Sequence, residues 1–196
     1  MLGAKVVQFI KPARRVTFTV IHCSAASRES VDVIEVDKWH KQRGWAGCGY
    51  HYFIKSDGTV QQGRDIEKTP AAQSGHNSGS IAICLNGLLE TDFTDAQFDS
   101  LRWLCSQINT AYNGDMKFYG HRDFTNAKTC PVFDYRGVLH LSSTGVMLGK
   151  QAQAKANSAK ARILISKQVV MAYQQTKGLT ADGIVGPKTW RVLTNG

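Results

Sequence analysis

The stretch that most constrains the fold of this chain covers residues 119–134, which read YGHRDFTNAKTCPVFD. They bring His121 and Cys130 into one short loop-like segment, and imidazole and thiolate are side chains that bind zinc well. A catalytic zinc ion usually takes three protein ligands and leaves its fourth position to water. The obvious third ligand is His22, which ends the apolar run at residues 16–21. The sequence therefore predicts a hydrolytic zinc site made of these three residues.

Other interpretations of the same residues stay open. A histidine at the end of a buried strand can equally be a core residue whose ring is satisfied by hydrogen bonds. Cys23 is a rival ligand, but adjacent strand residues point to opposite faces, which separates it from His22. A purely structural zinc site at His121 and Cys130 would need a fourth ligand, and none lies nearby in the sequence.

Strands and helices alternate along the first two thirds of the chain. Short apolar or alternating runs predict strands at residues 16–22, 50–54, 59–62, 81–85 and 117–119. Helical spacing of apolar residues predicts one helix over 31–43 and another that opens with the capping box of Thr94 and Gln97. This order indicates an α/β fold with a mixed central sheet flanked by helices, followed by a small helical C-terminal region.

The length of 196 residues suits one well-buried domain with a small appendage. Residues 149–160 are rich in Ala, Lys and Gln, which is typical of a linker or a solvated helix. Helical spacing returns at 163–173, and a turn-rich end with a helix started by Pro187 follows. We expect a main domain over residues 1–138, a linker over 139–160 and a helical module over 161–196.

The net charge of +9 is unevenly distributed. Residues 1–138 carry 16 basic and 14 acidic side chains, a net +2, whereas residues 139–196 carry 8 and 1, a net +7. The basic tail favours a polyanionic partner such as nucleic acid, acidic lipid or a bacterial envelope. Nucleic acid is the weakest of these candidates, because no basic motif interleaved with aromatic residues supports base stacking.

Cysteine usage and hydropathy point to a protein made and kept in a cytoplasm. The five cysteines are widely spaced and form no CxxC pair, which fits reduced thiols better than a disulfide framework. The longest apolar runs are shorter than the ~18 to 20 residues that span a bilayer. The N-terminal residues lack the apolar core and the cleavage site of a secretory signal.

Four blocks carry a resemblance to a known family: IHCSA at 21–25, GWAGCGYHYFIKSDGTVQQGR at 44–64, HNSGSIAICLNG at 76–87 and GHRDFTNAKTCP at 120–131. Together they resemble the zinc-dependent N-acetylmuramoyl-L-alanine amidases, which include amidase-type phage lysozymes and the peptidoglycan-recognition proteins. The likeness covers roughly residues 15–138. Residues 178–190, GLTADGIVGPKTW, resemble the second half of a small helical peptidoglycan-binding module.

The resemblance implies roles for particular residues. The family's zinc ligands fall on His22, His121 and Cys130, its catalytic tyrosine on Tyr50, and the lysine of the phage branch on Lys128. The implied reaction is hydrolysis of the amide between N-acetylmuramic acid and the L-alanine of the stem peptide. The general base is left open between the tyrosine, zinc-bound hydroxide and solvent.

The resemblance also suggests contacts with substrate and with other partners. We expect His51, His76 and Asn77 to contact peptidoglycan, although Tyr50 and His51, as neighbours in a strand, cannot both face one cleft. The implied protein is a phage-type endolysin that waits in the host cytoplasm for a holin. The alternative is a peptidoglycan-recognition protein without activity, but such members typically lack the cysteine ligand found here at Cys130.

Overall fold

The computed structural model describes residues 7–149, 167–176 and 178–181. The chain separates into two compact units, Met1–Met147 and Leu148–Gly196. The first unit holds the central sheet, and the second contributes a helix over residues 167–176. Among the residues that the structure describes, no helix combines the length and the apolar character needed to cross a membrane.

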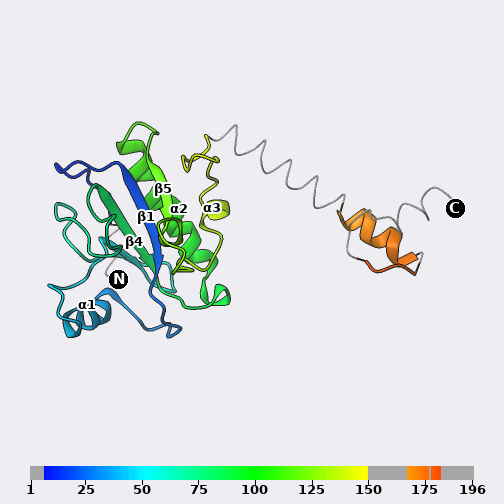
Figure 1. Ribbon diagram of the computed structural model, residues 1–196, viewed down its shortest axis with the longest axis horizontal. Coiled ribbons are helices and arrows are strands. Elements are labelled where there is room, and N and C mark those ends of the chain that lie inside the picture. Colours follow the sequence, from blue (N-terminus) through cyan, green and yellow to red (C-terminus); the bar gives the residue numbers. More distant parts are fainter. Residues whose placement is uncertain (1–6, 150–166, 177, 182–196) are drawn as a thin grey trace, which may run out of the picture. The chain divides into compact units, whose positions relative to one another are not determined.

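The first unit is built on a five-stranded sheet with the order β3-β2-β4-β1-β5 (Figure 1). Its strands are β1 (Phe18–Cys23), β2 (Tyr52–Ile54), β3 (Val60–Gln62), β4 (Ser80–Leu85) and β5 (Lys117–Gly120). Neighbouring strands run parallel except β2 and β3, which form an antiparallel hairpin. The prediction of a mixed sheet is confirmed, and the expected strands occur with ends shifted by only a few residues.

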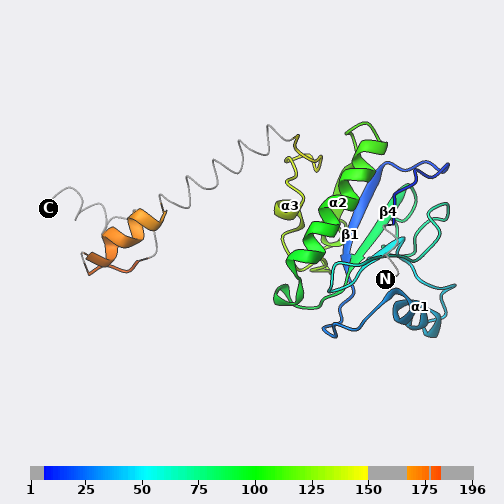
Figure 2. The same ribbon diagram turned by 180° about the vertical axis from the view of Figure 1, so that it is seen from behind.

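Helices cover both faces of this sheet. Helix α1 (Val33–Gln42) and helix α2 (Asp95–Ala111) lie on opposite sides of it (Figures 1 and 2). Successive strand residues point to opposite faces of the sheet, and each face has its own hydrophobic core. Ile83 packs in the larger core on the α2 side, and Cys84 packs in the smaller core beside α1. The remaining short elements are η1 (Glu90–Asp92), η2 (His121–Asp123) and α3 (Tyr135–Val138).

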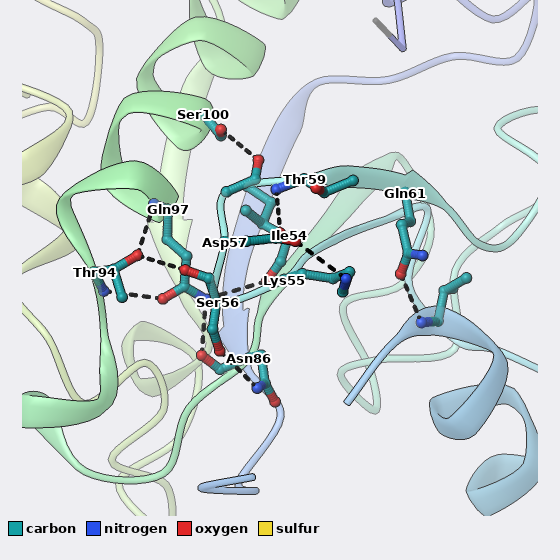
Figure 3. Close-up of polar contacts among 12 residues, drawn as sticks. Ile54, Lys55, Ser56, Asp57, Thr59, Gln61, Asn86, Thr94, Gln97 and Ser100 are labelled. Atoms are coloured by element: carbon teal, nitrogen blue, oxygen red, sulfur yellow. Dashed lines mark hydrogen bonds and ion pairs between the residues drawn. The ribbon is translucent and has the colours of Figure 1, made fainter. Parts of the chain in front are cut away.

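The predicted capping box is confirmed at the start of α2 and also ties this helix to the sheet. The Thr94 hydroxyl accepts a hydrogen bond from the Gln97 backbone N–H at 3.2 Å, and Gln97 Oε1 accepts one from the Thr94 N–H at 3.0 Å. The Gln97 amide then donates to the carbonyls of Ile54 and Asn86, at 3.2 and 2.9 Å (Figure 3). One glutamine thus joins α2 to the ends of β2 and β4.

The segment after α3 belongs to the first unit. Leu139 is fully buried, and the Phe118 N–H donates to the Gly145 carbonyl at 2.8 Å. Isolated bridges pair Lys117 with Val146 and Leu141 with Met147. The compact part of this unit therefore continues to Met147, past residue 138.

The second unit is described only in part. Residues 167–176 are helical, and the helix ends where the Leu179 N–H donates to the Gln174 carbonyl at 2.9 Å and Gly178 takes a φ of +67°. The expected helix at Pro187 and most of the expected linker lie outside the described residues.

Candidate active site

Two of the predicted zinc ligands leave the carboxyl ends of neighbouring parallel strands. Ile21 of β1 pairs with Gly120 of β5, so the residues that follow them, His22 in β1 and His121 at the start of η2, lie beside each other. The centres of the two imidazole rings are 4.9 Å apart. Ligand sites of open α/β sheets gather at this carboxyl edge.

Cys130 reaches the two histidines because the loop after η2 folds back on itself. The Arg122 backbone N–H donates to the Cys130 carbonyl at 2.6 Å, and the Arg122 guanidinium donates to the carbonyls of Pro131 and Phe133. The peptide bond between Cys130 and Pro131 is cis. The Cys130 sulfur accepts a hydrogen bond from the Cys23 N–H at 3.1 Å. Arg122 therefore fastens the loop segment that carries Cys130 to η2, which begins at His121.

The three side chains converge to metal-binding distance. One ligand atom from each of His22, His121 and Cys130 lies within 4.8 Å of the other two. In the described part of the chain, this is the only group of three or more His, Cys, Asp or Glu side chains that comes so close together. Two nitrogens and one sulfur form a donor set that suits a catalytic zinc ion with one position left open.

The surroundings keep both imidazoles neutral near pH 7. Burial, and then the neighbouring His121, lowers the pKa of His22 to about 3. Burial, and then the positive charge of Lys128, lowers the pKa of His121. Each ring therefore has a lone pair free for a metal ion.

The thiols of Cys130 and Cys23 are neighbours that shift each other's pKa. The contact with Cys130 lowers the pKa of Cys23 to about 6, while the same contact and burial raise the pKa of Cys130. These directions describe the two thiols alone. A cation held by His22 and His121 would reverse these two pKa shifts. Its positive charge would favour the thiolate form of Cys130, which also accepts a hydrogen bond from the Cys23 N–H.

The metal-binding cluster opens into a cavity of about 620 Å³ that Tyr50 and Lys128 also line. The Tyr50 ring centre is 5.3 Å from that of His22. Burial raises the pKa of Tyr50 well above its usual value, so the hydroxyl keeps its proton and can donate a hydrogen bond. Gly49 allows this placement: a Cβ there would meet the Ala71 carbonyl oxygen at 2.2 Å. The close approach expected just before Tyr50 is therefore present.

The structure does not bring the three expected substrate contacts to this cavity. His51, just before β2, is fully buried and does not line the cavity, and its ring accepts from the Ala82 N–H at 3.0 Å and donates to the Lys68 carbonyl at 2.9 Å. His76 is exposed and its ring lies against Phe124. Asn77 bonds within its own loop, where Oδ1 accepts from two backbone N–H groups.

Other side chains at the cavity were not predicted. Trp45, Leu88 and Leu89 are large apolar residues that are exposed at its edge, and His40 of α1 lies beneath Trp45. Gln73 contacts His22, with its Oε1 atom 2.9 Å from His22 Nε2. Apart from His40, these residues lie in loops without periodic patterns, so only the folded chain brings them to the site.

Comparison with known proteins gives the class of this fold and site. Residues 12–133 match the family model described as N-acetylmuramoyl-L-alanine amidase, and residues 165–193 match that of a putative peptidoglycan binding domain. The endolysin of Enterobacteria phage T3 is 39% identical over an alignment of 137 positions, which covers 66% of this chain and 89% of that protein.

Two solved structures show the same fold. The endolysin N-acetylmuramoyl-L-alanine amidase LysCS of Clostridium intestinale has a TM-score of 0.58 and 27% identity, over 65% of this chain and 83% of that one. Drosophila PGRP-LB has a TM-score of 0.54 and 24% identity, over 62% and 78%, a likeness that concerns the fold alone.

The chain belongs to the N-acetylmuramoyl-L-alanine amidase family. It is an amidase of the phage endolysin type, and its substrate is peptidoglycan. The fold and the enzyme class implied by the four sequence blocks are therefore confirmed.

Proposed function

We propose that His22, His121 and Cys130 hold a zinc ion and that Tyr50 and Lys128 act beside it in hydrolysing the amide between N-acetylmuramic acid and L-alanine. One observation carries this proposal: the three ligand atoms lie within 4.8 Å of one another at the wall of a cavity that the tyrosine and the lysine also line. When bound, zinc supplies Lewis-acid polarisation of the scissile carbonyl and lowers the pKa of its water to about 7.

Lys128 is placed to stabilise the negative charge that develops on the carbonyl oxygen. It is exposed at the cavity, and it forms no ion pair with any side chain in the described residues, so its ammonium group is free for substrate. A positioned donor of this kind typically contributes on the order of 100- to 1000-fold in rate.

Tyr50 serves as a hydrogen-bond donor in this mechanism. Its ring is held between His22 and His40, with ring centres 5.3 and 5.5 Å away, which fixes the direction of the hydroxyl. A protonated phenol in this position can orient the attacking water or the carbonyl oxygen of the substrate.

Digestion of purified peptidoglycan, with and without a zinc chelator, tests the proposal when the released fragments are weighed by mass spectrometry. We expect stem peptides with a free L-alanine amine, lost on chelation and restored by added zinc. Cleavage that survives complete removal of zinc would refute the metal role. Binding to the wall without release of fragments would favour a recognition protein.

We further propose that the C-terminal module holds the enzyme on the cell wall. The match of residues 165–193 to a putative peptidoglycan binding domain supports this role, and so does the net charge of +7 over residues 139–196, which favours an anionic envelope. We also propose that the enzyme resides in the host cytoplasm and reaches the wall with the help of a holin.

A further inference from the structure

Gln73 lies directly behind the predicted zinc ligand His22. It belongs to the loop between β3 and β4, and its side chain is buried, with 2% of its surface exposed. Its Oε1 atom is 2.9 Å from His22 Nε2. A buried amide in contact with a metal-ligand histidine can set both the tautomer and the direction of the ring.

Two acceptors fix the orientation of the Gln73 amide. Its nitrogen lies 3.0 Å from the His76 carbonyl oxygen and 3.0 Å from Ser80 Oγ. A carbonyl oxygen can only accept, so the NH₂ group must stand on that side. The Ser80 hydroxyl gives its own hydrogen to the Asn77 carbonyl at 2.8 Å, which leaves its lone pairs for Gln73. Oε1 is therefore the atom that faces His22.

This orientation decides where His22 carries its proton. Gln73 Oε1 has no hydrogen to give, so His22 Nε2 must donate one across the 2.9 Å contact. A neutral ring protonated on Nε2 has its lone pair on Nδ1. His22 Nδ1 is the atom that lies 4.0 Å from Cys130 Sγ, inside the predicted metal cluster.

We propose that Gln73 is a positioning residue that holds His22 in the Nε2–H tautomer with Nδ1 turned toward the metal. The inference rests on the metal site proposed above. Metal-bound histidines commonly donate their second N–H to a protein acceptor, and loss of that partner typically costs 10- to 100-fold in metal affinity.

The surrounding loop is built to keep Gln73 in place. Asn77 Oδ1 accepts hydrogen bonds from the backbone N–H groups of Ala72 and Gln73, at 3.0 and 2.9 Å. The His76 ring packs on Phe124, with ring centres 4.5 Å apart. His76 and Asn77, which the sequence suggested as substrate contacts, thus support the residue behind His22.

The test compares Gln73→Met, which keeps the length of the side chain but has no oxygen, with Gln73→Glu, which keeps the acceptor for His22 and loses the donor to the His76 carbonyl. Gln61→Met is the matched control, because Gln61 also accepts a hydrogen bond, from the Val33 N–H, but lies away from the cavity. Zinc affinity is measured by competition with a chelating dye. The tautomer of His22 is read from long-range ¹H–¹⁵N spectra of the zinc-free wild-type protein.

We expect Gln73→Met to bind zinc about 10- to 100-fold more weakly than wild type. Gln73→Glu should recover part of this loss, because it keeps the acceptor for His22 but sets an oxygen against the His76 carbonyl. Gln61→Met should bind normally, and wild-type His22 should carry its proton on Nε2. Unchanged zinc affinity in Gln73→Met, or a proton on Nδ1 in the wild type, would overturn the role of Gln73. A wild-type protein that binds no zinc would instead overturn the proposed metal site. If Gln73→Met fails to fold, the position of the proton on His22 in the wild-type protein still tests the role of Gln73.

Discussion

The Nδ1 atom of His22 lies 4.0 Å from the Sγ atom of Cys130, although 108 positions separate the two residues in the chain. Parallel pairing of β1 with β5 places His22 beside His121, and the loop after η2 folds back so that Cys130 lies close to both histidines. At this distance both side chains would hold one zinc ion together, since Zn–N and Zn–S bonds are about 2.0 and 2.3 Å long.

Replacement of Cys130 by alanine should therefore remove zinc and activity together. Zinc affinity is expected to fall by more than about 100-fold, because losing a ligand costs more than losing a partner behind it. Elemental analysis of the purified variant, alongside a peptidoglycan digestion assay, measures both effects. Cys105→Ala is the control: this thiol belongs to the buried face of α2 and does not line the cavity, so the variant should keep its zinc. A zinc-free Cys130→Ala with full activity would refute the site.

Lys128→Ala should separate catalysis from metal binding. We expect normal zinc content and a kcat lower by about 100- to 1000-fold, because an exposed ammonium group at the cavity stabilises the transition state without holding the metal. Lys55→Ala is the matched control, since Lys55 pairs with Asp57 at 3.2 Å on the β2–β3 hairpin and does not line the cavity. If kcat is unchanged and only KM rises, Lys128 contributes to binding and not to the chemical step.

The fold of the first unit was largely predictable from local patterns. Strand alternation and the capping box of Thr94 and Gln97 depend on residues a few positions apart, and the structure confirms both. The alternation also showed that Tyr50 and His51 face opposite ways. It could not show which of the two faces the cavity, because that depends on which core lies on each side of the sheet.

The support of the site was not predictable from the sequence. Gln73 and His22 are 51 positions apart, and the loop that carries the glutamine has no periodic pattern that would place it. The same holds for the segment that ends at Met147, because the bridge from Val146 to Lys117 is a tertiary contact. Side chains in such loops acquire a role only when the strands around them have paired.

Buried His51 should make the protein less stable in acid. Burial lowers its pKa to about 4, and its ring must stay neutral to accept from the Ala82 N–H. Between pH 6.5 and 4 the unfolded chain binds this proton and the folded chain does not. The stabilisation is therefore complete above pH 6.5 and is lost as the pH falls toward 4, by about 3 kcal/mol in total at ~1.4 kcal/mol per pKa unit.

Urea unfolding of the zinc-free protein from pH 7 to 4.5 measures this loss. The variant His51→Gln keeps a polar side chain that does not titrate, so its stability should fall less steeply than that of the wild type over the same range. The difference in slope should approach ~1.4 kcal/mol per pH unit, which corresponds to one proton. Parallel curves for the two proteins would show that His51 is not the titrating group.

Removal of residues 150–196 should weaken wall binding and spare the metal site. The first compact unit ends at Met147, so its sheet, cavity and zinc ligands remain in the shortened chain. A linked module raises the effective concentration of the enzyme at the wall, and its loss should reduce co-sedimentation with purified cell walls by at least about tenfold. Zinc content and cleavage of a small soluble muropeptide should stay unchanged.

Added salt should weaken wall binding by the full-length chain more than by the shortened one, because the tail carries most of the net charge. Equal wall binding by the two proteins would mean that the C-terminal module does not anchor the enzyme.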